Sequence, residues 1–238
     1  MKVSFVIPTL NEHGNITRLI QKINEISIEN NLHFEIIIVD DNSTDGTIND
    51  VQILQKSLKN LNLIVRKRPQ GIGSAHIVGY NNAKGDLIIS MDADLSHPPE
   101  KIPDLIKEIK KGYDIVIGSR YMKGAISDKS VFYRFLSMLG SFYLSLMFRI
   151  KLTDFSNGFR AIKNNIWNQI SNYKYSNENT FLVESLYFAF NKGARVGEIP
   201  ASFSEREIGE SKTHLFKESL KAIFLPFQLK FRIKKIFL

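Results

Sequence analysis

The chain has 238 residues, of which 43% are hydrophobic, and its formal net charge at pH 7 is +8. This apolar content suffices for one large domain, or a domain with an appendage, and argues against intrinsic disorder. The absence of cysteine excludes disulfides and thiolate metal sites. The excess of positive charge predicts an anionic partner, which would be nucleic acid, a phosphorylated small molecule or an acidic membrane surface.

Strands and helices alternate along the first half of the chain. The opening run MKVSFVIPTL is typical of a short strand. It lacks the apolar length and the cleavage site of a secretory signal. Apolar runs rich in β-branched residues predict strands, and apolar residues three and four apart predict helices. We expect strands at residues 3–7, 34–39, 62–65, 87–91 and 114–117, and helices at residues 15–27, 47–58, 74–83 and 100–110. This pattern is typical of a parallel sheet with helices on both faces.

The second half of the chain contains an almost wholly apolar segment at residues 131–150, interrupted by Arg134. Its longest uncharged run, residues 135–148, is shorter than the about 20 residues that cross a bilayer. The segment therefore predicts either a buried core helix or a helix in a membrane interface, and no membrane span. A further helix is expected at residues 181–191 and a strand at residues 196–199.

The C-terminal tail, residues 216–238, is both basic and apolar. Apolar and cationic side chains together favour an anionic bilayer, so one interpretation of the tail is a membrane-surface segment. The other is an ordinary terminal helix that packs on the domain.

Polar side chains follow four of the predicted strands, at the point where each strand ends. They are Asn11 and Glu12, Asp40 and Asp41 with Asn42, Asp92 and Asp94, and Ser119 with Arg120. Any one of these sets is also typical of helix caps and turns. Because ligands of parallel sheets bind outside the carboxyl ends of the strands, we predict that all four sets line one crevice.

Asp92 and Asp94 stand one residue apart in the sequence MDADLSHPPE, residues 91–100. Two neighbouring carboxylates repel one another unless a cation lies between them. Mg²⁺ or Mn²⁺ fits this pair, because these ions accept few carboxylates and complete their shell with water and phosphate oxygens. His97 is either a metal ligand or a packed turn residue, and we favour the turn residue.

Residues 71–76 read GIGSAH and look like a phosphate-binding loop that opens a helix, but the third glycine of a dinucleotide fingerprint is absent. We expect Gly71 and Gly73 to let the backbone approach a ligand closely. Lys67 and Arg68, just before this loop, are either solvated or serve an anionic site.

Seven motifs together resemble the family-2 glycosyltransferases over residues 1–215, and within that family they are most similar to dolichyl-phosphate mannose synthases. The motifs are VIPTLNE (6–12), IVDDNSTDGT (38–47), GIGSA (71–75), MDADLSHPPE (91–100), GSRYMKG (118–124), DFSNGFRA (154–161) and REIGESK (206–212). The resemblance implies a GT-A fold, which is a Rossmann-like α/β fold with a mostly parallel sheet. It implies a catalytic domain at residues 1–215, including the apolar segment 131–150, followed by the tail.

The resemblance also implies roles for individual residues. The nucleotide sugar would be held by Pro8, Leu10, Glu12, Val39, Asp40, Asp41, Asp92, Ala93, Asp94, Arg120, Arg206 and Lys212. The divalent metal would be held by Asp92, Asp94 and Ser96, and the acceptor phosphate by Arg120 and Arg134. Asp92, Asp94, Arg120 and Arg134 would thus carry catalysis. Leu10 stands where many members have Tyr, and Ser96 where some have Gln.

The implied reaction is metal-dependent transfer of mannose, with inversion, from GDP-mannose to a polyprenyl (dolichyl) phosphate. The alternative among enzymes is transfer from a UDP-sugar, glucose or GlcNAc, to a polyprenyl phosphate or to a polysaccharide hydroxyl. A receiver-like signalling module or a non-catalytic nucleotide-binding scaffold are alternatives of another class. We expect a peripheral protein on the cytoplasmic side of a membrane, which contacts the membrane surface directly or through a separate membrane-anchoring subunit. No nucleic-acid-binding motif is visible.

Overall fold

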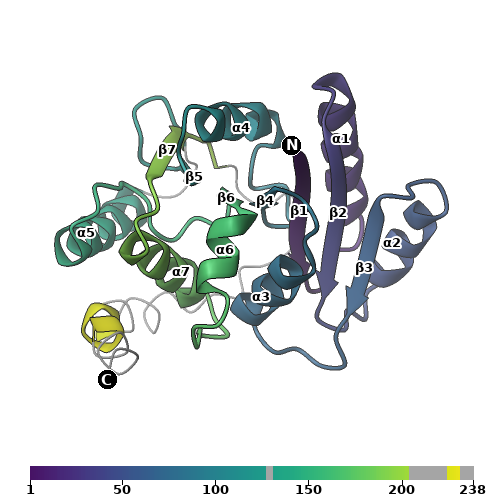
Figure 1. The fold of residues 1–238 in the computed structure, drawn as a ribbon. Helices are drawn as coiled ribbons and strands as arrows, with labels where there is room; N and C mark the ends of the chain where they lie inside the picture. The colour runs from purple at the N-terminus through teal and green to yellow at the C-terminus, as the bar shows by residue number, and fades with distance from the viewer. Residues whose placement is uncertain (127–130, 204–223, 231–238) are drawn as a thin grey trace.

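Seven strands form one sheet in the order β3-β2-β1-β4-β6-β5-β7 (Figure 1). This computed structural model of the protein describes residues 1–126, 131–203 and 224–230. The strands are β1 (Lys2–Thr9), β2 (His33–Asp40), β3 (Leu61–Val65), β4 (Leu87–Ser90), β5 (Ile115–Ser119), β6 (Arg160–Lys163) and β7 (Val196–Pro200). The helices are α1 (Asn15–Glu29), α2 (Thr47–Gln55), α3 (Ile72–Asn82), the 3-10 helix η1 (Pro99–Lys101), α4 (Ile102–Lys110), α5 (Val131–Phe148), α6 (Asn164–Ile170) and α7 (Thr180–Asn191).

The sheet is mostly parallel, as the sequence predicts. β1 pairs in parallel with β2 and β4, β2 with β3, and β5 with β7. Within this ladder Val6 lies opposite Ile37 on one side and Ser90 on the other. The exception is β6, which runs antiparallel to both of its neighbours, β4 and β5. The sequence analysis did not identify β6 or the helix α6 that follows it.

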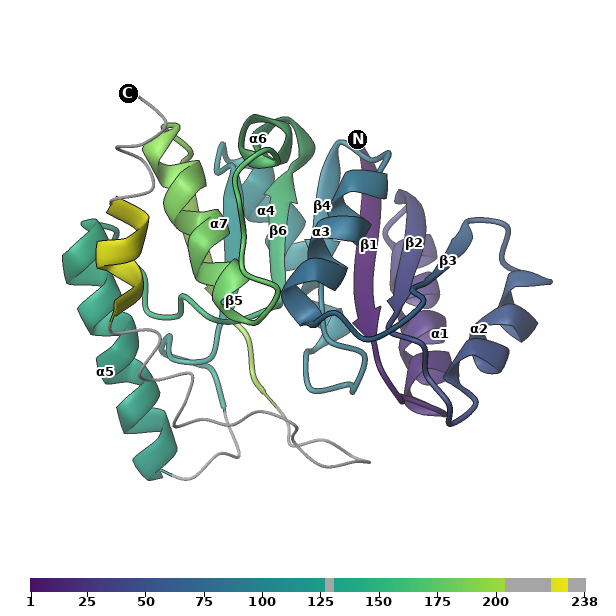
Figure 2. The same cartoon turned by 90° about the horizontal axis from the view of Figure 1, so that it is seen from below.

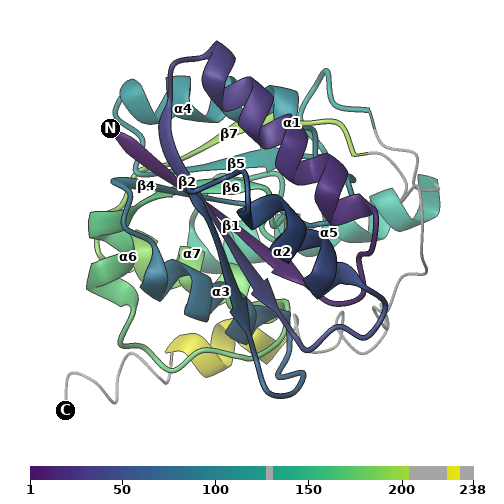
Figure 3. The ribbon, with the colours of Figure 1, turned by 90° about the vertical axis from the view of Figure 1, so that its right-hand side faces the viewer.

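Helices cover both faces of the sheet (Figures 1 and 3). Successive residues of a strand point to opposite faces, so Ile36 and Ile38 of β2 enter one apolar core and Ile37 and Val39 enter the other. The first core is completed by α1, α2 and α4, and the second by α3, α5, α6 and α7. Burial on both sides explains why β2 carries an uninterrupted apolar run at residues 36–39.

Helix α5 is only partly buried. Leu144 and Phe148 are 5% and 6% exposed and pack into the second core, whereas Phe132 and Phe142 are 70% and 67% exposed. The interpretation as a buried core helix therefore holds for one side of α5 and not for the other, and a place in a membrane interface stays a prediction. Figure 2 shows α5 and the short helix at residues 224–230 at the same end of the molecule. Among the described helices, none has the length and apolar character needed to cross a membrane.

The short helix at residues 224–230 is the described part of the predicted tail. Its residues Leu225 and Leu229 are 4% and 0% exposed and pack into the second core. This part of the tail therefore packs on the domain as a terminal helix, and the rest of residues 216–238 lies outside the described residues.

Candidate active site

The carboxyl ends of β1, β2, β3 and β4 lie at one edge of the sheet, because these strands are parallel. β5 ends at the same edge, since both it and β4 pair antiparallel with β6. β6 runs the opposite way, so the loop that precedes it, residues 154–159, also reaches this edge. The polar residues that follow four predicted strands are therefore at one edge, as expected, and the 154–159 loop joins them.

Asp92 and Asp94 lie in the turn after β4 and differ in their surroundings. The Asp94 side chain is buried, and its Oδ1 accepts hydrogen bonds from the Ser96 N–H at 3.1 Å and the Ser96 hydroxyl at 2.6 Å. Ala93, between the two aspartates, packs into the first core. The Asp92 side chain is 32% exposed, and a methyl group added at Gly158 would lie 3.1 Å from its Oδ1. The turn thus fixes Asp94 and leaves Asp92 accessible to a ligand beside the 154–159 loop.

This turn offers two carboxylates to a metal ion. Within the described residues, no group of three or more His, Asp or Glu side chains is placed to hold a metal. Mg²⁺ and Mn²⁺ are often bound by one or two carboxylates together with water and phosphate oxygens. Asp92 and Asp94 therefore fit such an ion when a diphosphate completes its shell. Ser96 donates its hydroxyl hydrogen to Asp94, and its role as a third ligand stays a prediction.

His97 is a packed turn residue, which confirms the interpretation that the sequence favours. It is 2% exposed, and its Nδ1 accepts a hydrogen bond from the Asp92 N–H at 2.9 Å. The other ring nitrogen, Nε2, lies 3.7 Å from Asp92 Oδ2. The ring stacks on Phe159 with centroids 5.6 Å apart. His97 thus supports the turn that carries Asp92.

Asp40 is fully buried at the end of β2. Its Oδ2 accepts hydrogen bonds from the Thr9 hydroxyl at 2.8 Å and the Ser43 hydroxyl at 2.7 Å, and its Oδ1 accepts one from the Ser43 N–H at 2.7 Å. Because Thr9 ends β1, Asp40 joins the ends of the two central strands. Its contact with a nucleoside stays a prediction.

Asp41 is paired with Arg66, a residue that the sequence analysis did not identify. Arg66 Nε donates a hydrogen bond to Asp41, Nη2 completes the ion pair, and both side chains are almost fully buried. Arg66 also donates to the Ser74 hydroxyl and, at 3.1 Å, to the Gly71 carbonyl. The second Asp41 oxygen accepts a hydrogen bond from the Gln70 N–H at 3.3 Å. One arginine therefore connects the predicted nucleoside aspartate with the start of α3.

The other predicted nucleoside residues of β1 and β2 lie side by side. Pro8 pairs with Val39 across the two strands, and both are buried. Leu10 and Glu12 are half-buried in the loop after β1. The Glu12 N–H donates a hydrogen bond to the Thr47 hydroxyl at 2.8 Å, which ties this loop to the start of α2. These residues form one wall of the edge that holds the aspartates.

Gly71 and Gly73 lie against the chain itself. A methyl group at Gly71 would meet the Asn177 carbonyl oxygen at 2.3 Å, and one at Gly73 would meet that of Glu178 at 2.4 Å. The Asn177 carbonyl also accepts a hydrogen bond from the Gly73 N–H at 2.8 Å. The prediction that these glycines bring the backbone close to a ligand is therefore wrong, because the loop before α7 occupies that position.

Arg120 follows β5, and Asp154 holds its guanidinium. Nε donates to Asp154 Oδ2 at 2.7 Å, Nη2 to Oδ1 at 2.9 Å, and Nη2 also to the Ser156 hydroxyl at 2.9 Å. The side chains of Arg120 and Asp154 are 12% and 0% exposed. Burial alone lowers the pKa of the Arg120 guanidinium, but the Asp154 carboxylate outweighs this effect and raises the pKa above its ordinary value. The negative charge of Asp92 acts in the same direction, so Arg120 lies within electrostatic reach of the predicted metal site.

The remaining predicted cations are placed differently. Arg134 lies in the first turn of α5 and is half-buried. Arg206 and Lys212, predicted to close over the diphosphate, lie outside the described residues. Lys67 and Arg68 are exposed, whereas Arg66, directly before them, is buried in its ion pair with Asp41.

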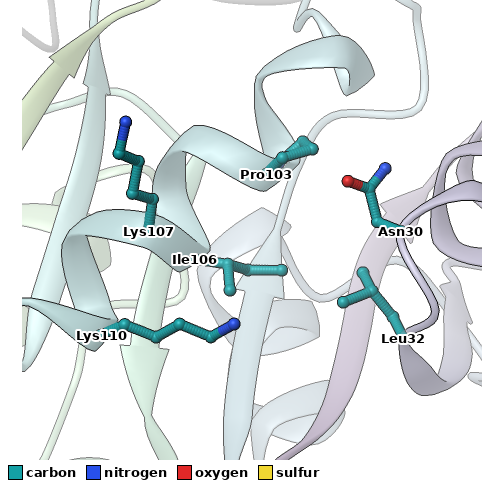
Figure 4. A pocket seen from close by; sticks show the side chains of 6 residues that line it. All are labelled: Asn30, Leu32, Pro103, Ile106, Lys107 and Lys110. Atoms are coloured by element: carbon teal, nitrogen blue, oxygen red, sulfur yellow. The ribbon is translucent and has the colours of Figure 1, made fainter.

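A hollow of about 200 Å³ lies away from this edge, between the end of α1 and α4 (Figure 4). Its lining residues are Asn30, Leu32, Pro103, Ile106, Lys107 and Lys110. Leu32 directly precedes β2, so the hollow is near the amino ends of the strands. It is therefore separate from the carboxylates and Arg120.

Comparison with known proteins agrees with this arrangement. The model of glycosyl transferase family 2 matches residues 4–170. A dolichol-phosphate mannosyltransferase of Pyrococcus furiosus is 37% identical over 215 residues, which are 89% of this chain and 59% of that protein. An undecaprenyl-phosphate mannosyltransferase of Micrococcus luteus is 30% identical over 217 residues, which are 89% of this chain and 87% of that protein.

The fold is shared with a crystal structure of glucosyl-3-phosphoglycerate synthase from Mycobacterium tuberculosis in complex with Mn²⁺, UDP and phosphoglyceric acid. The TM-score is 0.70 at 16% identity, with 94% of this chain and 78% of the other covered. At that identity the likeness concerns the fold alone, and it confirms the expected GT-A type. The alternative of a receiver-like module is wrong, because the family match extends from β1 through α6. The chain belongs to glycosyl transferase family 2 and is a glycosyltransferase.

Proposed function

We propose that this protein transfers mannose from GDP-mannose to a polyprenyl phosphate, with inversion and with Mg²⁺ or Mn²⁺ bound. Two relatives are named as mannosyltransferases of dolichol phosphate and undecaprenyl phosphate, and each aligns with 89% of this chain. Both lipids are polyprenyl phosphates, which supports the acceptor class. Both relatives are named for mannose transfer, which supports the sugar. The donor nucleotide is proposed from the motif resemblance at the ends of β1, β2 and β4.

Asp92 and Asp94 would hold the metal ion, which supplies positive charge opposite the departing diphosphate. Hydrogen bonds within the chain hold both aspartates in the turn. Ser96 donates two hydrogen bonds to Asp94, and His97 accepts one from the backbone of Asp92. Arg206 and Lys212 would add charge at the diphosphate.

The observation that carries the proposal is that the acid–base groups near Arg120 already accept hydrogen bonds within the chain. A phosphate monoester is mostly dianionic at neutral pH because its second pKa is about 6, so it attacks without a general base. A sugar hydroxyl needs such a base. Asp154 accepts hydrogen bonds from Arg120, and His97 Nδ1 accepts one from Asp92. Asp154 and His97 are thus both engaged in hydrogen bonds within the chain, which supports a phosphate acceptor over a polysaccharide hydroxyl.

Helix α5 supports a lipid acceptor at a membrane surface. Its outward apolar residues, each at least 43% exposed, are Phe132, Phe135, Leu136, Met138, Leu139, Phe142 and Leu146. Arg134 near its start and Arg149 directly after its end add positive charge. An apolar face between cations favours an anionic bilayer, so we place α5 in the interface with the lipid chain alongside it. A chain without cysteine fits the reducing, cytoplasmic side of that membrane.

The test is transfer of radiolabelled sugar to butanol-extractable lipid, with dolichyl or undecaprenyl phosphate in vesicles and Mg²⁺ or Mn²⁺. We expect label from GDP-mannose, none from UDP-glucose or UDP-GlcNAc, and complete loss on addition of EDTA. Label from a UDP-sugar would replace the proposed donor. Absence of lipid label from every donor would contradict the proposal for this chain acting alone, and activity restored by membrane extract would indicate a separate membrane-anchoring subunit.

A further inference from the structure

Asp154 lies at the centre of a hydrogen-bonded network between the end of β5 and the loop before β6. Besides the two guanidinium contacts, its carboxylate accepts hydrogen bonds from the Arg120 N–H at 3.3 Å and the Ser156 N–H at 3.2 Å. Nε and Nη2 of Arg120 are thus both directed at Asp154. In the part of the chain that the structure describes, no hydrogen bond uses Nη1 of Arg120. The carboxylate therefore occupies one side of the guanidinium and leaves Nη1 for another partner.

Glu198 of β7 holds the backbone at Asp154. Its two oxygens accept hydrogen bonds from the Thr153 N–H at 3.0 and 2.8 Å, and its Oε1 accepts another from the Asp154 N–H at 2.9 Å. The Thr153 hydroxyl lies 3.0 Å from Glu198 Oε1 and 2.6 Å from the hydroxyl of Ser119, which ends β5. Burial raises the pKa of Glu198, and the negative charge of Asp154 raises it further. Two carboxylates are therefore kept close together although they repel.

We propose that Asp154 is a positioning residue for Arg120, supported by Glu198, and that it presents Nη1 of Arg120 to the acceptor phosphate. The assignment of Arg120 to the acceptor rests on the proposed function. A bidentate carboxylate fixes both the plane and the direction of a guanidinium, and a phosphate that must attack in line requires a donor fixed in this way.

Two other roles for Asp154 fit the structure less well. A general base must reach the substrate, whereas Asp154 is 0% exposed and both of its oxygens accept hydrogen bonds from Arg120. A purely structural role does not account for a buried ion pair with a second carboxylate beside it, because apolar packing stabilises a fold equally well or better.

The test is steady-state kinetics of the full chain with Asp154→Asn, which keeps the side-chain shape and removes its charge. We expect the apparent KM for dolichyl phosphate to rise about tenfold or more, and that for GDP-mannose to change less than about threefold. Asp114→Asn is the matched control, since Asp114 pairs with Lys163 at 2.8 Å beside the start of β5, away from the site. It should leave both KM values unchanged. Equal rises of both values in Asp154→Asn would overturn the proposal.

A double-mutant cycle separates positioning from general damage to the fold. If Asp154 acts through Arg120, Asp154→Asn has no further effect on the lipid KM in the Arg120→Ala background. Glu198→Gln is the second variant, in case Asp154→Asn does not fold. It should raise the lipid KM by a smaller factor, and this rise should also vanish in the Arg120→Ala background. Additive effects in either cycle would overturn the proposal.

Side-chain NMR distinguishes this inference from the proposed function. The Nε–H signal of Arg120, identified by its loss in Arg120→Lys, should be protected from solvent exchange in the wild type. Asp154→Asn should remove this protection, and Asp114→Asn should not. If the wild type transfers no sugar to lipid phosphate, the proposed function fails, while a protected signal still supports positioning by Asp154. An unprotected signal in the wild type overturns the positioning whatever the reaction.

Discussion

Arg66 and Asp41 form a buried ion pair that joins the ends of two neighbouring strands, β3 and β2. Replacing Arg66 by Met leaves the Asp41 carboxylate buried without its partner. We expect this to lower the free energy of unfolding by about 3–5 kcal/mol and to weaken GDP binding, because the pair also fixes the start of α3. Urea unfolding and calorimetric titration with GDP measure the two effects.

The control for this prediction is Lys67→Met, at the exposed neighbouring position. It should change the free energy of unfolding by less than about 0.5 kcal/mol. If Arg66→Met were as stable as Lys67→Met, the ion pair would not stabilise this edge of the sheet.

Asp92→Asn and Asp94→Asn should each abolish transfer with little loss of stability. Each substitution removes a negative charge that a metal ion needs, and at the same time relieves repulsion between the two carboxylates. Turnover with Mn²⁺ and thermal unfolding measure the two properties. Asp104→Asn on α4, where Asp104 forms an exposed pair with Lys101 of η1, should leave turnover unchanged. Substantial turnover in both site variants would exclude the proposed metal role.

Arg134→Ala should raise the apparent KM for the lipid phosphate much more than that for GDP-mannose. Arg134 lies in the first turn of α5, on the helix that we place in the membrane interface. Loss of one charged contact to phosphate corresponds to about tenfold or more in affinity. Lys107→Ala, on α4 near the other end of the sheet, should change neither value. An equal rise of both KM values would remove Arg134 from the acceptor site.

A double substitution, Phe135→Ser with Phe142→Ser, should weaken binding of the protein to anionic vesicles without lowering its melting temperature. These rings are 64% and 67% exposed, so they contribute little to the core. Flotation with vesicles of phosphatidylserine and phosphatidylcholine measures the binding. The control is Ile53→Ser on α2, where an apolar side chain is 53% exposed. Equal flotation of wild type and double variant would show that α5 does not contact the bilayer.

His76 on α3 should make the protein less stable in mild acid. In the described part of the chain neither ring nitrogen has a hydrogen-bond partner, and burial lowers the pKa of His76 from 6.5 to about 3. Between these values the unfolded chain binds a proton that the folded chain does not. The free energy of unfolding therefore falls as the pH drops from 6.5 toward about 3.

His76→Phe should remove this loss of stability in acid, because phenylalanine binds no proton. The new ring should fit, since the imidazole already stacks on Phe181 with ring centroids 5.7 Å apart. Urea unfolding at pH 7 and pH 5 would show a smaller difference for the variant than for the wild type. His33→Gln, at an exposed histidine, should leave the pH dependence as it is. Parallel pH curves for His76→Phe and wild type would contradict the prediction.

The strands and helices that follow local periodicity could be predicted from sequence, but β6 could not. Its sequence RAIK is short, and a charged residue stands at each end. Its place depends on β4 and β5, which come much earlier in the chain, and on the buried Arg160. The Arg160 guanidinium donates hydrogen bonds to the carbonyls of Phe155, Asn157 and Leu182. The carbonyls of Phe155 and Asn157 are close in sequence, but that of Leu182 belongs to α7, and no local sequence pattern indicates this contact.

The same distinction applies to the site. The positions of Asp92, Asp94 and Arg120 at one edge of the sheet could be predicted, because carboxylates and arginines after predicted strands are visible in the sequence, while their roles stay predictions. The partners Arg66 and Asp154 could not, because a side chain's partner depends on which loops meet in three dimensions. The prediction for Gly71 failed for a related reason: a glycine signals a close approach but not which group approaches.

Strand β6 enters the sheet between β4 and β5, against their direction. The residues proposed to contact the nucleoside and the metal all precede His97. Arg120, Asp154 and Glu198, in contrast, come from the segments around β5, β6 and β7. The apolar cores on both faces of the sheet nevertheless continue across the β4–β6 pairing, because each contains residues from both sides of it. Under the proposed roles, the residues for the metal and those for the acceptor phosphate therefore come from separate stretches of the sequence but share one continuous packed sheet.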